Sequence, residues 1–195
     1  LDAIIDADYY DFTRSWGEDQ AASMSNGSGE EYTIVFTAAG SVFIRGLYHE
    51  SPMLAKHDGL WPGLLDGLPD EFRPHVDEPA FFGPDDSLDA TFVLWRRAGD
   101  DAWQAGRDID FSPAETDETD PDGSWLLDIL LDDIAELYVE YAEEIFEVTP
   151  DLAAVEHVVA FRPLTDEVIA AIDPEADPEK IRRRAAEIGY PVGPA

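Results

Sequence analysis

Residues 20–50 read QAASMSNGSGEEYTIVFTAAGSVFIRGLYHE, and this stretch decides the fold. Two glycine-containing turns, Asn26–Gly29 and Ala38–Ser41, separate runs that are rich in β-branched and aromatic residues. Such runs between turn residues are typical of antiparallel strands joined by hairpins. The stretch therefore predicts a three-stranded meander over residues 20–26, 31–38 and 41–48. Both faces of the third strand are partly apolar, which predicts a central position in the sheet.

The segments on either side of the meander predict further elements. Apolar residues at steps of four, three and four predict an amphipathic helix over residues 2–16. Residues 49–89 are rich in proline and predict a long ordered loop with short helical turns, one of which begins at Pro62. Residues 90–97 and 102–106 predict a second hairpin.

The C-terminal third of the sequence predicts helices. Ser124 is a candidate N-cap for the strongest one, 125–146. The segment VEHVVAF (155–161) fits a strand or a helix, and its valines favour a strand. Two closing helices are predicted over 165–172, capped by Thr165, and over 178–188, between Asp177 and Gly189. We therefore predict a single globular α+β domain over residues 1–195, in which the meander and the hairpin form an antiparallel sheet packed against helices.

Net charge is the extreme feature of the composition. The chain has 44 Asp and Glu against 12 Lys and Arg, a formal net charge of −32, and the acids are densest in residues 101–150. A surface of this charge repels nucleic-acid backbones and anionic membranes, so we expect neither as a partner. Either general acidity, as in salt adaptation, or a surface built to meet a basic protein or to mimic nucleic acid would explain the excess.

Several chemical classes are excluded or disfavoured. The chain has no cysteine, which excludes thiol nucleophiles, Cys-ligated zinc and disulfide scaffolds. Neither GxxxxGK[ST] nor GxGxxG occurs, and we expect no cofactor. There is no run of about 18 apolar residues, and the opening LDAIIDADYY lacks the pattern of a signal peptide. We therefore expect a cytoplasmic protein.

The stretch GLYHESPM (46–53) sets a histidine beside a carboxylate and a hydroxyl. His49 and Glu50 are candidate binding residues, and together with His57 they form the weaker alternative of a metal site. A proline-containing segment separates the two histidines without the fixed spacing of a helix or hairpin. We predict no metal site here and expect His49 and Glu50 to cap the strand end. Ser51 lacks a GxSxG context, and no catalytic residue is assigned.

Two groups of cations have structural interpretations. Arg45 lies within an apolar strand, where a cation is usually paired, and Glu50 or a helix acid is the expected partner. Arg182–Arg184 form a basic run on the last helix, and we expect it to make salt bridges with the acidic remainder of the chain.

Six blocks carry a resemblance to known sequences. They are SMSNGSGEEYTIVF, RGLYHESPM, WPGLLDGLP, ATFVLWR, RPLTDEV and EIGYPV, in this order. The chain resembles a set of bacterial proteins, chiefly from actinobacteria, that share these blocks and have no known activity. The resemblance covers almost the whole chain and so implies one domain. It implies no catalytic residue, cofactor or partner.

The function we favour is that of a non-enzymatic protein-binding module that meets a basic partner, as toxin-neutralising immunity proteins do. The expected contact surface is the acidic face of helix 125–146, and Arg45, His49 and Glu50 are further candidates. The acids of that face are Asp132, Asp133, Glu136, Glu140, Glu143 and Glu144. A metal-dependent or small-molecule enzyme that uses the loop 49–60 is one alternative, and an acidic housekeeping domain is another. The sequence leaves the oligomeric state open.

Overall fold

The computed structural model describes residues 1–117, 119–131 and 133–193. Contacts between Cα atoms divide the chain into two compact units. Unit 1 consists of Leu1–Arg14 and Leu127–Ala195, and unit 2 is Ser15–Leu126. The α+β class is confirmed, because the described residues combine an antiparallel sheet with helices. That residues 1–195 form a single domain stays a prediction.

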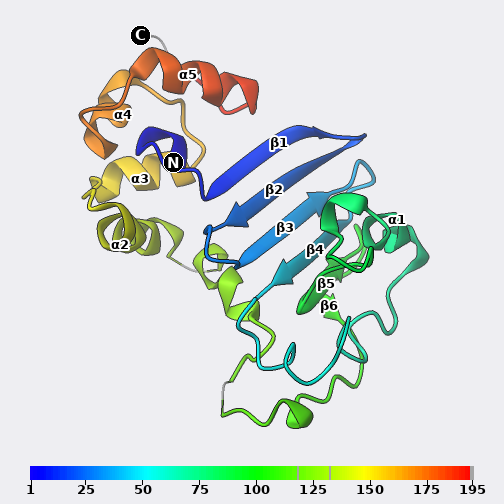
Figure 1. Cartoon of the computed structure of the whole chain (residues 1–195). Coiled ribbons are helices and arrows are strands. Elements are labelled where there is room, and N and C mark those ends of the chain that lie inside the picture. The colour runs from blue at the N-terminus through cyan, green and yellow to red at the C-terminus, as the bar shows by residue number, and fades with distance from the viewer. Residues whose placement is uncertain (118, 132, 194–195) are drawn as a thin grey trace. The chain divides into compact units, whose positions relative to one another are not determined.

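The strands of the described residues form one six-stranded sheet whose spatial order is the order of the chain (Figure 1). The strands are β1 (Tyr10–Trp16), β2 (Asp19–Ser25), β3 (Glu31–Phe36), β4 (Val42–Leu47), β5 (Phe92–Arg96) and β6 (Gln104–Ala105). Each pair from β2 to β6 is antiparallel. The predicted meander and second hairpin are therefore confirmed.

Strand β4 is central, as its two apolar faces predicted, because it pairs with β3 on one side and β5 on the other. Gly46 lies opposite Phe92 in the β4–β5 register. A Cβ atom on Gly46 would lie 2.0 Å from the Phe92 ring, so the aromatic ring occupies the space that any side chain at this position would need. Phe92 and the neighbouring Val93 are almost completely buried.

The prediction of an opening helix over residues 2–16 is wrong. A 3₁₀ turn, Asp2–Ile4 (η1), is followed by strand β1. Gly17, with φ of +63°, then reverses the chain into β2. The apolar spacing that suggested a helix therefore arose from two shorter elements. Their aromatic residues fit a strand at least as well as a helix.

Proline-rich residues 49–89 form the expected ordered segment with short helical turns. These turns are η2 (Asp70–Phe72), α1 (Arg73–Val76) and η3 (Pro79–Phe81), and hydrogen-bonded turns also follow Pro62. Phe72 and Phe81 from this segment join Val35 and Phe43 of the sheet in one buried cluster of unit 2. A second cluster of unit 2 gathers Met53, Trp61, Leu64 and Ala114. The long loop is thus held by its own aromatic and aliphatic side chains.

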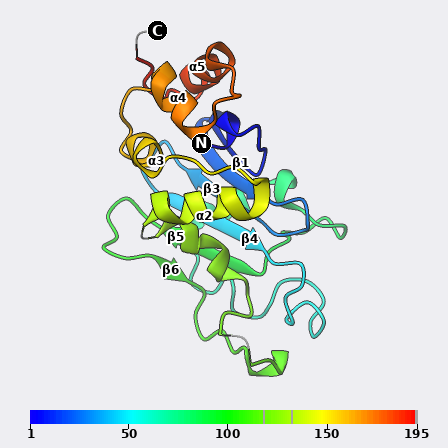
Figure 2. The same cartoon turned by 90° about the vertical axis from the view of Figure 1, so that its left-hand side faces the viewer.

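The helices of unit 1 are α2 (Ile134–Phe146), α3 (Leu152–Val159), α4 (Asp166–Ile172) and α5 (Pro178–Glu187). Figure 2 shows them in the yellow to red part of the chain. The predicted caps of the last two are confirmed, since Thr165 accepts a hydrogen bond from the Val168 amide and Asp177 accepts from the Glu179 and Lys180 amides. None of the described helices is both long and apolar enough to cross a membrane.

Two helix predictions need correction. Residues Ser124–Leu130 form a 3₁₀ helix (η5), and α2 begins only at Ile134, so no continuous helix spans 125–146. Asp133, directly before α2, has φ of +54°, a left-handed backbone that a right-handed helix cannot pass through. The segment 155–161 is not a strand, because its residues up to Val159 belong to α3. Asp151 caps α3 by accepting from the Ala154 amide at 3.0 Å.

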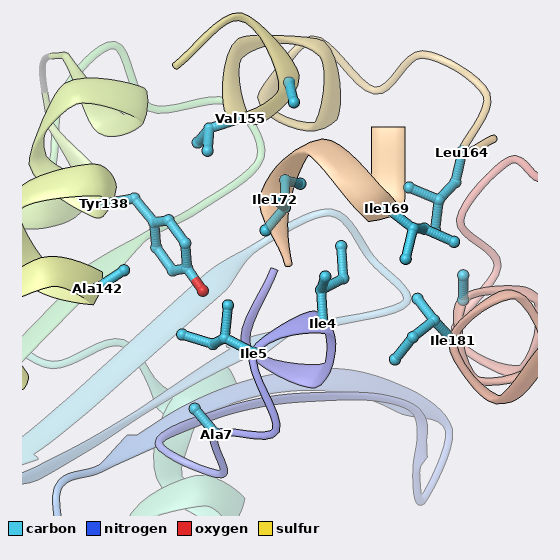
Figure 3. Close-up of a cluster of buried hydrophobic side chains, with 12 residues drawn as sticks. Ile4, Ile5, Ala7, Tyr138, Ala142, Val155, Leu164, Ile169, Ile172 and Ile181 are labelled. Carbon is cyan, nitrogen blue, oxygen red and sulfur yellow. The ribbon is translucent and has the colours of Figure 1, made fainter. Parts of the chain in front are cut away.

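The core of unit 1 is mostly aliphatic and draws on α2, α3, α4 and α5. Ile4 and Ile5 at its N-terminal turn converge with side chains of α2 to α5 (Figure 3). Val155 and Ile169 are completely buried there. This packing explains why α3 is a helix in spite of its valines, since burial of one helix face outweighs intrinsic propensity.

Candidate functional site

The acidic residues of α2 form an exposed face. Asp133, Glu136, Glu140, Glu143 and Glu144 are all exposed, whereas Tyr138 and Ala142 on the opposite face are buried. Glu147, which directly follows the last residue of the helix, is also exposed. We call these six acidic residues the α2 acid face. The four glutamates within α2 occupy about a third of the helix circumference. Asp132, predicted to belong to this face, lies outside the described residues.

The α2 acid face is not neutralised within the described residues, because none of their ion pairs includes one of its six acids. Cations of α5 in the same unit are instead paired elsewhere. Arg182 pairs with Asp166, and Arg184 lies 3.2 Å from Asp11. Lys180 lies 3.2 Å from Asp6. Two arginines of the run 182–184 therefore make the expected salt bridges.

His49 pairs with Glu30, not with its neighbour Glu50. The His49 Nδ1 atom lies 2.6 Å from Oε1 of Glu30, while Asn26 donates to Oε2 of the same carboxylate at 2.6 Å. The Glu50 side chain is exposed and makes none of the hydrogen bonds found among the described residues. The expected cap of His49 and Glu50 is thus replaced by a network that ties the β2–β3 turn to the end of β4.

Burial alone would raise the pKa of Glu30, but the hydrogen bonds from Asn26 and His49 outweigh it and hold the pKa below its ordinary value. Glu30 is only 7% exposed, whereas the His49 side chain is 43% exposed. Gly29 makes this arrangement possible, since a Cβ atom there would lie 2.7 Å from the imidazole. The imidazole is held by a buried carboxylate, and its side chain stays partly exposed to solvent.

The alternative metal site at His49, Glu50 and His57 is not assembled. Among the residues that the structure describes, no group of three or more His, Asp or Glu side chains could hold a metal ion. His57 instead lies edge-on to Trp61, with ring centroids 6.1 Å apart. The Ser51 hydroxyl is buried and donates to the Pro121 carbonyl at 2.6 Å, which gives it a structural role.

Arg45 is buried and paired, as expected, but with a different partner. Its Nη1 atom lies 2.6 Å from Oε1 of Glu31. The β3–β4 register sets Arg45 opposite Thr33, so Glu31 is its diagonal neighbour on the same face of the sheet. The guanidinium also lies 5.0 Å from the ring centroid of Phe81. Arg45 therefore acts within the core of unit 2, and Glu50 is not its partner.

Sequence reasoning missed a cavity of about 360 Å³ whose lining residues all belong to unit 1. Aliphatic and aromatic side chains make up most of its wall, among them Ile4, Phe12, Ile134, Leu164, Ile181 and Ile188. Asp2 and Tyr138 also line it, and we call it the Asp2–Tyr138 cavity. Asp2 carried no usable signal in the sequence, because it is one of 44 acids and stood in a segment predicted to be helical.

The carboxyl group of Asp2 is a buried polar group in the wall of this cavity. Asp2 is 5% exposed; its Oδ1 atom accepts from the Tyr138 hydroxyl at 3.1 Å and its Oδ2 atom accepts from the Tyr10 amide at 2.9 Å. Burial raises the pKa of Asp2, and these hydrogen bonds oppose the rise. No ion pair between described side chains includes this carboxylate.

Comparison of the chain with protein-family models, with curated proteins and with solved structures found no match. The resemblance to the actinobacterial set stays a prediction.

Proposed function

We propose that this protein is a non-enzymatic binding module whose α2 acid face meets a basic protein partner. One observation carries the proposal: six exposed acids gather on and beside one helix, and none of them is paired with a cation among the described residues. The nearest chemical complement of such a face is a surface of Lys and Arg side chains. A small basic protein that is held inactive in the complex, as in toxin neutralisation, has this chemistry.

The like charges of the α2 acid face destabilise the helix, and a basic partner would offset this destabilisation. Glu136 and Glu140, and Glu140 and Glu144, are like charges four residues apart, and each such pair destabilises a helix by about 0.2–0.5 kcal/mol. Three cations of unit 1 are bound to other acids of the same unit: Lys180, Arg182 and Arg184. A basic partner would supply cations that relieve the repulsion, and the field of the acids would speed its association.

The same charge distribution argues against other partners. Nucleic-acid backbones and anionic membrane surfaces carry the same sign as this face and would be repelled. A cytoplasmic location fits the proposal. If the acids serve only solvation, as in a housekeeping domain, charge reversal on α2 and charge reversal elsewhere should have the same effect on binding.

The test is capture of a basic partner with two matched variants. Glu136→Lys with Glu140→Lys reverses charge within the α2 acid face. Glu156→Lys with Glu187→Lys makes the same change in net charge at exposed positions of α3 and α5. We expect the first variant to lose a partner that the wild type and the second variant retain at low salt. Equal retention by both variants would favour the solvation role.

A further inference from the structure

We propose that the Asp2–Tyr138 cavity binds a small apolar molecule with one polar group that donates hydrogen bonds, a hydroxyl or an ammonium, and that it rejects the corresponding carboxylate. The inference is independent of the proposed function, because the lining residues do not include any acid of the α2 acid face. Every lining residue belongs to unit 1.

The size of the cavity fits a ligand better than a packing defect. Protein interiors are packed as densely as organic crystals, and voids larger than a water molecule are few. A volume of about 360 Å³ falls within the usual range of small-molecule sites, roughly 300–1,000 Å³. Val155 and Ile169, in the hydrophobic cluster to which several lining residues belong, are completely buried. The open volume therefore lies beside a fully buried part of the core.

The walls select an apolar body. The lining side chains come from η1, β1, η5, α2, α3 and α5 and from the loops beside them, and Ile or Leu residues recur on most of these elements. An aliphatic or aromatic group placed there exchanges contact with water for contact with these side chains, which is the usual source of affinity for such a ligand.

Asp2 selects the polar end of the ligand. A carboxylate offers about four acceptor positions. The Tyr138 hydroxyl and the Tyr10 amide fill one on each oxygen, which leaves capacity for a further donor. Binding of a hydroxyl or an amine is favoured because its donor can hydrogen-bond to this buried acceptor. Binding of a carboxylate is disfavoured because two negative charges would repel each other.

Arg184 does not reverse this preference. It lines the cavity and would attract an anionic head group, but its Nη2 atom already lies 3.2 Å from the Asp11 carboxylate, which lines the cavity as well. Asp11 therefore offsets the charge of Arg184 within the cavity wall. A ligand with a negative head would have to displace Asp11 from Arg184.

The experiment titrates the protein with octan-1-ol, octylamine and octanoate, which share one apolar body. Binding is followed by the methyl resonances of isoleucine at pH 8, in about 0.3 M NaCl so that the acidic surface is screened. Ile4, Ile134 and Ile181 report on the cavity, and Ile34 and Ile44 in the sheet of unit 2 serve as internal controls. A stronger response to octylamine would assign the donor to an amine, and a stronger response to octan-1-ol would assign it to a hydroxyl.

Two kinds of variant make the test specific. Ala185 lines the cavity and is buried, while Ala186 on the same helix is exposed and does not line it. Ala185→Leu should weaken binding of the preferred ligand at least about tenfold by filling the space, and Ala186→Leu should leave it unchanged. Asp2→Asn removes the charge while keeping the shape, so octanoate should gain affinity and the preference for a donor should shrink.

The proposal predicts that the wild type binds the alcohol or the amine at least about tenfold more tightly than octanoate, with shifts confined to the cavity methyl groups. Equal binding of octanoate would overturn it, as would the absence of cavity shifts with all three compounds. If Ala185→Leu does not fold, the proposal is tested by Asp2→Asn alone, through its change in selectivity between the donor ligands and octanoate.

Discussion

The Nδ1 atom of His49 lies 2.6 Å from Oε1 of Glu30, so the histidine at the end of β4 pairs with a carboxylate from the β2–β3 turn. This contact bridges 19 positions of the sequence. The buried partner of the imidazole is therefore not the adjacent glutamate, Glu50. The pair holds two segments of unit 2 together.

The Glu30 contact predicts a pH-dependent contribution to stability. The pKa of Glu30 is lower in the folded protein than its ordinary value of 4.5. The contribution is therefore fully present above pH 4.5 and is lost as the pH falls through the lower, folded value. Glu30→Gln should cost about 1–3 kcal/mol of unfolding free energy at pH 7, and this difference should shrink below pH 4. Urea unfolding of both proteins across this range measures it; a pH-independent difference would contradict the account.

Divalent metal should leave the melting temperature of the wild type unchanged, because the described residues do not gather a metal-binding group around His49. Titration with zinc and manganese checks this expectation, with His49→Ala as the matched variant. A metal-dependent rise in melting temperature that disappears in His49→Ala would instead favour an enzyme built on the loop 49–60.

The Arg45–Glu31 pair should contribute more to the free energy of unfolding than an ion pair on the surface does. Arg45 is 5% exposed, so removal of its partner leaves a largely buried guanidinium without its carboxylate. We expect Glu31→Gln to cost about 1–3 kcal/mol, because Glu31 is itself partly exposed to solvent. Glu18→Gln, at an exposed position outside these ion pairs, should change stability by less than about 0.5 kcal/mol. If the two substitutions changed the stability equally in thermal unfolding, the Arg45–Glu31 pair would contribute nothing to the stability of the fold.

Gly46 should tolerate no side chain. Its Cβ would meet the Phe92 ring at 2.0 Å, and Phe92 is almost completely buried. Gly46→Ala should therefore cost at least about 1–3 kcal/mol through overpacking. Gly99→Ala is the control, since a Cβ atom there meets nothing within 4 Å. A Gly46→Ala protein as stable as the Gly99→Ala protein would refute the close approach of Phe92.

The meander was predictable because its signals are local. The turn at Asn26–Gly29 is fixed by its own residues, with the Ser28 amide donating to the Asn26 side chain at 2.9 Å. The caps of α4 and α5 are local as well. The helix start at Ile134 was not predictable, because the left-handed backbone of Asp133 is a conformation that aspartate adopts only occasionally. The sequence periodicity continues through it without a break.

The candidate sites were predictable only in part, because they depend on partners distant in sequence. The exposed acids of α2 followed from the amphipathic pattern alone. The Glu30 partner of His49 and the Glu31 partner of Arg45 depend on strand register, which brings them together across β3 and β4. The Asp2–Tyr138 cavity joins residues 136 positions apart and required the packing of the whole unit.

Neutral substitutions on α2 should separate stability from binding. Glu136→Gln with Glu140→Gln removes a like-charge pair, so it should raise the melting temperature at low salt and reduce the stabilising effect of added salt. The wild type should gain several degrees between low and molar salt. A melting temperature that is lower in the double variant would show that these acids stabilise the fold and are not held ready for a partner.

The most direct test of the central claim is the dissociation constant for the isolated basic partner, measured by calorimetry at two salt concentrations. Glu136→Lys with Glu140→Lys should weaken binding at least about tenfold, and Glu156→Lys with Glu187→Lys should weaken it much less. Added salt should weaken wild-type binding and have less effect on the α2 variant. Equal dissociation constants for the two double variants would contradict the claim that the α2 acid face is the binding surface.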